Sequence, residues 1–166
     1  NGPCAESVSL AKREGPFLWG GIHPRPLWSF DGEILEVEMR IDGSALSRTV
    51  KPLADDREGW LVRDAFEQQL GQAGAFTVHW QFAPESLVER VGKRLFRVVS
   101  GTAEMTIEIG DGWTGAELWQ LDSSETKGDL DGIVSPRFMK TTHAPYLKLA
   151  AQPGGGGEFT TSFLAG

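Results

Sequence analysis

Strict two-residue alternation of apolar and polar side chains is the feature of this sequence that most restricts its fold. Residues 35–41 place Leu, Val, Met and Ile at every second position, with Glu, Glu and Arg between them. Residues 76–82 and 103–109 alternate in the same way. This period is typical of a β-strand with one buried face, because successive side chains of a strand point to opposite faces. The sequence therefore predicts sheets whose apolar faces need a second layer.

Glycine-containing turns separate the predicted strands. Asp31-Gly32, Asp42-Gly43 and Gly92-Lys93 each lie between two apolar runs, as expected for hairpins. Residues 60–70 are the only helix candidate, and they fit a loop with a brief strand equally well. Strands at a spacing of about 8 to 12 residues predict an all-β fold, an antiparallel β-sandwich of about ten strands with at most one short helix. The strand candidates are residues 17–19, 22–41, 45–50, 76–82, 87–91, 95–99, 103–109, 116–121, 133–139, 146–150 and 159–164.

The length of 166 residues suits one domain, since a compact domain of this size buries roughly 70% of its unfolded surface. Residues 1–16 are polar and contain two prolines, so we expect a tail or linker there. The sandwich is then a single domain over residues 17–166. The first residue is Asn1 rather than methionine, which we interpret as a fragment of a longer protein.

The formal net charge of −7 argues against nucleic acid as a partner, because phosphate-binding proteins present a basic face. Arg90, Lys93, Arg94 and Arg97 form the largest basic group in the sequence. No run of about 18 apolar residues occurs, so no membrane span is predicted. The single cysteine, Cys4, excludes an internal disulfide and fits the cytosol or a periplasmic or secreted protein.

Three histidines, His23, His79 and His143, were considered as metal ligands or acid–base groups. They are far apart and lack the short spacing of metal-binding motifs, so no metal and no cofactor is predicted. His79 lies on the strand face opposite to Trp80 and Phe82, and that polar face either meets solvent in a cross-strand pair or lines a groove.

Two further residues have an open interpretation. Arg25 follows His23 by two positions and either clamps a carboxylate of a ligand or pairs with a nearby acidic strand residue. Tyr146 follows His143 by three, a couple that suits proton transfer in β-elimination of a uronic acid sugar. A lone tyrosine in an apolar strand is more often a core residue, however, and no catalytic residue is assigned.

Six tryptophans are many for this length, and some are candidates for stacking on sugar rings. Trp80 and Trp119 lie in apolar strand segments, which favours the core. Trp60 and Trp113 lie beside glycines or in loops, so we expect them at the surface.

The order of His23, Arg25, the Asp31-Gly32 turn and the alternating strand 35–41 resembles the β-domain of heparinase II/III-like polysaccharide lyases. The histidine-containing strand that ends at Pro84 is similar to the next element of that family. Residues 132–136, 144–147 and 159–164 resemble its closing strands, so the resemblance runs over most of residues 15–165.

The resemblance implies a C-terminal domain that packs against an N-terminal helical toroid, with the substrate cleft between them. The implied reaction of the parent enzyme is β-elimination of an acidic polysaccharide such as a glycosaminoglycan. The family's catalytic groups come mainly from the helical part, so this chain is expected to support the cleft, to be inactive alone, and to be periplasmic or secreted. The residues assigned to substrate binding are His23, Arg25, His79, Trp60 and Trp113.

Two alternatives remain open. A stand-alone carbohydrate-binding module would present Trp60 and Trp113 as exposed, coplanar platforms. A structural or interaction module would have polar strand faces without any groove.

Overall fold

The structure, a computed structural model, describes residues 3–5, 12–13, 19–20, 25–41, 44–54, 56–67, 76–120, 133–137, 140–151 and 157–166. Among these residues every regular element is a strand and none is a helix. The strands form two main antiparallel sheets, so the predicted all-β class and antiparallel sandwich are confirmed.

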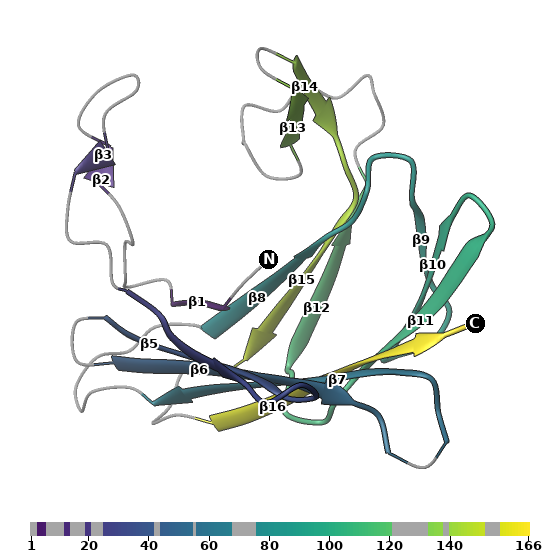
Figure 1. The fold of residues 1–166 in the computed structure, drawn as a ribbon. Coiled ribbons are helices and arrows are strands. Elements are labelled where there is room, and N and C mark those ends of the chain that lie inside the picture. The colour runs from purple at the N-terminus through teal and green to yellow at the C-terminus, as the bar shows by residue number, and fades with distance from the viewer. Residues whose placement is uncertain are drawn as a thin grey trace.

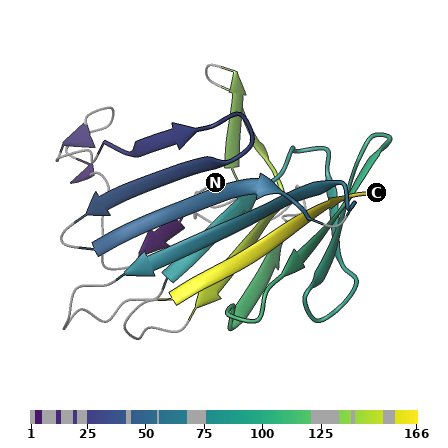
Figure 2. The ribbon, with the colours of Figure 1, turned by 60° about the horizontal axis from the view of Figure 1, so that its bottom comes forward.

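Eight strands form the larger sheet, in the spatial order β4-β5-β6-β7-β16-β11-β10-β9. They are β4 (Leu27–Phe30), β5 (Leu35–Ile41), β6 (Ser44–Pro52), β7 (Gly59–Glu67), β9 (Leu87–Arg90), β10 (Leu95–Ser100), β11 (Ala103–Ile109) and β16 (Gly157–Ala165). The last strand, β16, lies between β7 and β11 and so joins two groups of consecutive hairpins. Figure 2 shows these long strands side by side, with yellow β16 next to the blue strands.

The smaller sheet has four strands in the order β1-β8-β15-β12. They are β1 (Pro3–Ala5), β8 (Phe76–Gln81), β15 (Tyr146–Ala151) and β12 (Gly115–Trp119). Residues 3–5 lie in the segment predicted as a polar tail, yet they pair with residues 76–78 of β8. Two short ribbons complete the strands, β2 (Lys12–Arg13) with β3 (Trp19–Gly20) and β13 (Ile133–Arg137) with β14 (Lys140–His143).

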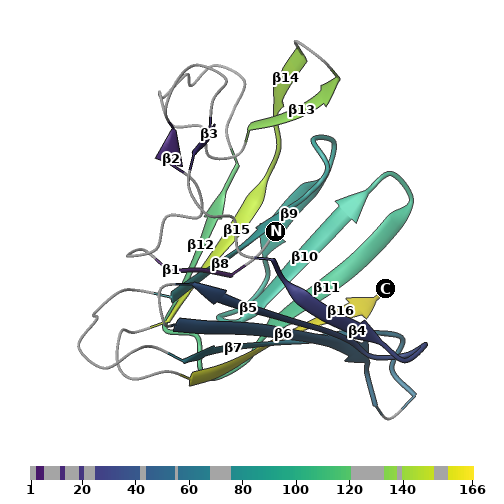
Figure 3. The ribbon, with the colours of Figure 1, turned by 60° about the vertical axis from the view of Figure 1, so that its left-hand side comes forward.

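The larger sheet curves around the smaller one. In Figure 1, β5, β6, β7 and β16 pass beneath β8 and β15, while β9, β10 and β11 rise beside them. Figure 3 shows the same arrangement from the side, with β12 and β15 standing close to β9 and β10. The apolar core fills the space between the sheets.

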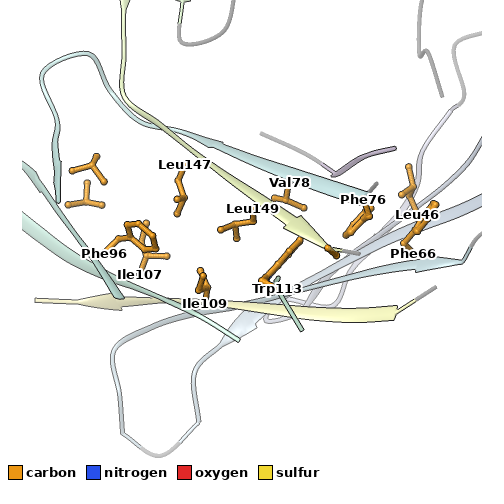
Figure 4. Close-up of a cluster of buried hydrophobic side chains, with 13 residues drawn as sticks. Leu46, Phe66, Phe76, Val78, Phe96, Ile107, Ile109, Trp113, Leu147 and Leu149 are labelled. Atoms are coloured by element: carbon orange, nitrogen blue, oxygen red, sulfur yellow. The ribbon is translucent and has the colours of Figure 1, made fainter. Parts of the chain in front are cut away.

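The core takes its side chains from the inward face of each strand. Leu147 and Leu149 of the smaller sheet point towards Phe96 and Ile107 of the larger one (Figure 4), and all four are fully buried. Burying one such side chain contributes about 1.5–3 kcal/mol relative to leaving it exposed. The two-residue alternation seen in the sequence therefore places the core correctly.

The predicted hairpin at residues 22–41 is present where the structure describes it, with β4 and β5 paired across Asp31-Gly32. Asp31 accepts hydrogen bonds from the backbone N–H groups of Glu33 (2.9 Å) and Ile34 (2.7 Å). Gly32 has φ of 105°, a conformation that side-chain-bearing residues rarely adopt. The two backbone donors also lower the pKa of the Asp31 carboxyl below its usual value.

β4 is an unusual strand, because its apolar side chains are exposed on both faces. Leu27 is 70% exposed, Trp28 71% and Phe30 57%. Among the described strands β4 ends the larger sheet.

Of the two interpretations of residues 60–70, the strand holds for the described part, since Gly59–Glu67 form β7, a central strand of the larger sheet, and the helix interpretation is wrong there. Val62, Asp64 and Phe66 point into the interior and are all buried. A fully buried aspartate interrupts the apolar side of the alternation, which hides the two-residue period in the sequence. Gly59, with φ of 146°, opens the strand.

The buried Asp64 is paired. Arg48 of β6 donates Nε to its Oδ1 at 2.7 Å and Nη2 to its Oδ2 at 3.0 Å. The guanidinium of Arg48 also lies 4.5 Å from the ring centroid of Trp80, which belongs to the opposite sheet. A bidentate ion pair thus sits inside the sandwich and contacts both layers.

Candidate functional site

The outer face of the smaller sheet, which points away from the core, carries a group of polar and aromatic side chains. We call His79, Glu117, Trp119, Tyr146 and Lys148 the outer-face cluster. Alternation puts them there, since their strand neighbours Val78, Leu118, Leu147 and Leu149 point inward. The register aligns His79 of β8, Lys148 of β15 and Glu117 of β12 in one row across the sheet.

The second row of the cluster is aromatic. Trp119 pairs with Tyr146, their rings are nearly parallel at 3°, and their centroids are 6.0 Å apart. The ring of His79 stacks diagonally on Tyr146, also with centroids 6.0 Å apart. Tyr146 is only 5% exposed, whereas Trp119 is 44% exposed. Trp119 is therefore the ring of this cluster that a ligand can reach.

The expectation that Trp119 lies in the core is wrong. Ala116 and Leu118 take the inward positions of β12 and pack against the core, so Trp119 takes an outward one. Glu117 shares the parity of Trp119, and this was the signal in the sequence that indicated an outward position.

A small pocket lies beside the cluster, at the end of the sheet where β8 finishes and β15 begins. It has a volume of about 200 Å³ and is lined by Pro84, Ser86, Gln120, His143, Ala144 and Pro145. Within the described residues the buried Nδ1 of His143 has no hydrogen-bond partner. The ring that stacks on Tyr146 is that of His79, whereas His143, the histidine considered with Tyr146 from the sequence, lines this pocket.

The cluster has the chemistry of a sugar contact rather than of a complete catalytic centre. An exposed indole can stack on the apolar face of a pyranose ring. The ammonium of Lys148 can bind a carboxylate or sulfate, and the carboxylate of Glu117 can accept hydrogen bonds from hydroxyls.

The other residues assigned to substrate binding lie apart from one another. His23 is outside the described residues. Arg25 is exposed and precedes β4 of the larger sheet, while His79 belongs to the smaller sheet. Trp60 is 51% exposed, but it lies on β7 of the larger sheet. The structure therefore brings only His79 into the outer-face cluster.

The expectation that Trp113 is exposed is wrong, since only 4% of it is accessible. Its Nε1 donates to the backbone oxygen of Thr160 at 3.0 Å, and its ring stacks on Phe76 with centroids 5.9 Å apart. The turn that precedes it, Gly110 to Gly112, directs the indole between the sheets. The coplanar pair of Trp60 and Trp113 required by the binding-module alternative does not exist.

Two features are absent from the described part of the chain. No three His, Cys, Asp or Glu side chains are grouped there closely enough to hold a metal ion. No described helix is long and apolar enough to span a membrane.

The geometry defines a two-sheet β-sandwich whose smaller sheet has an aromatic and charged outer face. No protein-family model and no curated protein matches the sequence. Solved structures do match. Heparan sulfate lyase HepC from Pedobacter heparinus aligns with 86% of this chain at 14% identity and a TM-score of 0.57, and a mutant of it at 15% and 0.58. The heparinase III BT4657 gene product aligns with 87% of this chain at 12% identity and a TM-score of 0.60.

These similarities establish a shared fold with one part of each of these structures. The chain spans only 21% of the HepC structures and 22% of the heparinase III structure.

Proposed function

We propose that this chain is the C-terminal β-sandwich domain of a heparinase II/III-like polysaccharide lyase, that it supports the substrate cleft of the parent enzyme, and that it is inactive alone. The observation that carries the proposal is how much of each chain takes part in the structural alignment. A heparan sulfate lyase contains this fold over 86% of our chain, yet the fold is 21% of that lyase. The order of sequence motifs over residues 15–165 supports the same family independently of the fold.

In this proposal the parent enzyme acts on an acidic polysaccharide by β-elimination, and an N-terminal helical toroid supplies the other wall of the cleft. The parent is periplasmic or secreted, where such polysaccharides are degraded. The outer-face cluster is the part of this chain that contacts the substrate, because it combines an exposed ring, Trp119, with a cation, Lys148.

The lyase proposal is tested by comparing the purified chain with the intact gene product. β-Elimination leaves an unsaturated uronate, which is followed by its ultraviolet absorbance. We expect product from the intact protein and none from the chain alone. Clear turnover by the chain alone contradicts the assignment as a non-catalytic domain. A gene that encodes no helical region before this domain contradicts the family assignment and favours a stand-alone binding or structural module.

The role of the cluster is tested by the Trp119→Ala variant in affinity electrophoresis through gels that contain heparan sulfate or another acidic polysaccharide. Because one stacking ring is lost, we expect the dissociation constant for the polysaccharide to rise about tenfold, which reduces retention in the gel. Trp28→Ala is the control, since Trp28 is 71% exposed on the larger sheet and Trp119 is 44% exposed on the smaller one. Equal retention of both variants and the unmodified protein contradicts a contact at the cluster.

A further inference from the structure

A second, basic pocket lies at the other end of β12, between the β9–β10 hairpin and the turn that connects β11 to β12. Its volume is about 420 Å³. We call it the basic pocket, and its lining includes Arg90, Lys93, Arg94, Asp111, Trp113 and Gly115. It shares no lining residue with the outer-face cluster or with the pocket beside His143.

The charge of the basic pocket is opposite to that of the protein. Its lining carries three cationic side chains and one carboxylate, which sum to +2, in a chain with a net charge of −7. A pocket of similar volume, about 390 Å³, is lined by Glu36, Glu38 and Arg48 and sums to −1. The excess of cationic side chains thus distinguishes the basic pocket from this second pocket.

The cations are held in different ways. Arg90 is fixed, because its Nη2 donates to the backbone oxygen of Ala116 and its guanidinium lies 4.9 Å from the ring centroid of Phe96. Arg94 forms an ion pair with Asp111, whose side chain is 96% exposed. Lys93 is exposed and forms no ion pair with any described side chain. One cation is therefore preorganised, and another has its charge available for a ligand.

The size and the walls of the pocket suit a sugar acid. Its volume falls within the range of about 300–1,000 Å³ that is usual for small-ligand sites. Trp113 adds only a small accessible edge to the lining, since it is 4% exposed, and the guanidinium of Arg90 is a planar donor of the kind that pairs with carboxylate or sulfate.

We propose that the basic pocket binds an anionic sugar residue, a uronate or a sulfated sugar, of the polysaccharide on which the parent enzyme acts. This inference rests on the proposed function and adds to it a second contact that shares no residue with the outer-face cluster. It also gives an acidic domain a local means of binding an acidic polymer, since cations within the pocket act at short range whereas the net charge is screened beyond about 10 Å in moderate salt.

The test uses a double charge reversal, Lys93→Glu with Arg94→Glu, and isothermal titration with four probes. The probes are an unsulfated polyuronate, heparan sulfate, a neutral glucan and inorganic sulfate. The matched control is Arg40→Glu with Arg63→Glu, which changes the net charge equally at side chains 80% and 45% exposed on the larger sheet. Thermal unfolding of both double variants checks that the fold is retained.

We expect the pocket variant to lose at least about tenfold in affinity for an acidic polymer, while the control changes by about twofold or less. A loss towards the polyuronate assigns carboxylate recognition, and a loss confined to heparan sulfate assigns sulfate recognition. Equal losses in both variants, no loss in the pocket variant, or binding of inorganic sulfate alone each overturn the inference. The proposed function is decided separately, by lyase activity of the intact protein, so the two can fail independently.

Discussion

Arg48 and Asp64 form a bidentate ion pair inside the sandwich, with the carboxylate of Asp64 fully buried and the side chain of Arg48 only 14% exposed. Burial raises the pKa of the Asp64 carboxyl, and the hydrogen bond and charge of Arg48 oppose that rise. Taking the carboxylate out of water thus outweighs its attraction to Arg48, as is common for buried ion pairs. The pair is therefore expected to contribute more to the specificity of strand packing than to the free energy of unfolding.

Removing only one partner of this pair should be costly. Arg48→Met leaves an uncompensated buried carboxylate and should lower the free energy of unfolding by about 3–5 kcal/mol in urea titrations. Arg48→Met combined with Asp64→Leu removes both charges and should recover most of that loss. If the double variant is no more stable than the single one, the loss does not come from the unpaired charge.

The same pair gives a dependence on pH. A raised folded-state pKa means that Asp64 adds most to stability below its unfolded value of 3.8, and that this contribution is lost as pH rises through the folded-state value. Arg48→Met raises this pKa further, so the deficit of the variant should shrink in acid, where the carboxyl is neutral. A deficit that stays constant between neutral and acid pH contradicts this account.

The turn between β4 and β5 should have the opposite dependence. Asp31 has a lowered pKa, because Ile34 and Glu33 donate backbone hydrogen bonds to it. Its contribution to stability is present above 3.8 and is lost as pH falls through the lower folded-state value. Asp31→Ala should therefore lower the thermal midpoint near neutral pH and have less effect in acid. Asp31→Asn, which keeps an acceptor oxygen but no charge, should retain part of the stability without the dependence on pH.

Gly59 should not tolerate a side chain. Its φ of 146° is outside the left-handed region that other residues visit, and a Cβ there would overlap the backbone oxygen of Phe163. Gly59→Ala should lower the free energy of unfolding by roughly 1–3 kcal/mol from backbone strain, with the overlap adding to this. Gly101 has φ of 61° and open space around it, so Gly101→Ala should cost about 1–2 kcal/mol. If the two variants lose similar free energies of unfolding, β16 shifts to relieve the overlap at Gly59, and the close contact there adds nothing to the loss.

Trp113 and Trp60 should differ in their effect on stability. Trp113→Ala removes a buried ring and a hydrogen bond, which should cost about 3–5 kcal/mol. Trp60→Ala removes a half-exposed ring and should cost about 1 kcal/mol or less. Chemical denaturation followed by circular dichroism measures both without relying on tryptophan fluorescence. A larger loss for Trp60 would contradict the burial assigned here.

Most of the strands were predictable because their alternation is complete. β5, β8 and β11 keep apolar residues inward and polar residues outward throughout, and the turns between them contain glycine. β7 could not be decided between a helix and a brief strand, because its inward aspartate is explained only by Arg48 on the neighbouring strand β6. β1 has three residues, and its pairing with β8 depends on contacts more than 70 residues away in the chain.

The site was harder to predict than the fold. The strand face of His79 was predicted correctly from the alternation. Trp113 was expected at the surface and Trp119 in the core, and the structure shows the reverse. Whether a tryptophan beside a turn points inward depends on the direction in which the chain enters the next strand. Arg90, Lys93 and Arg94 were recognised as a basic group, whereas Arg97 turns to the other face and pairs with Glu104 at 2.7 Å. Arg90, Lys93 and Arg94 line one pocket together with β12, which follows them in the chain by more than 20 residues.

The exposed apolar side chains of β4 have a practical consequence for preparing this chain. A strand that ends a sheet and carries apolar groups on both faces is a template for pairing with another molecule. Leu27 and Trp28 are each at least 70% exposed, so we expect this strand to promote self-association of the purified chain at high concentration. Lysine at position 27 is the substitution to make before crystallisation or calorimetry, because a charge on an edge strand opposes strand addition without entering the core.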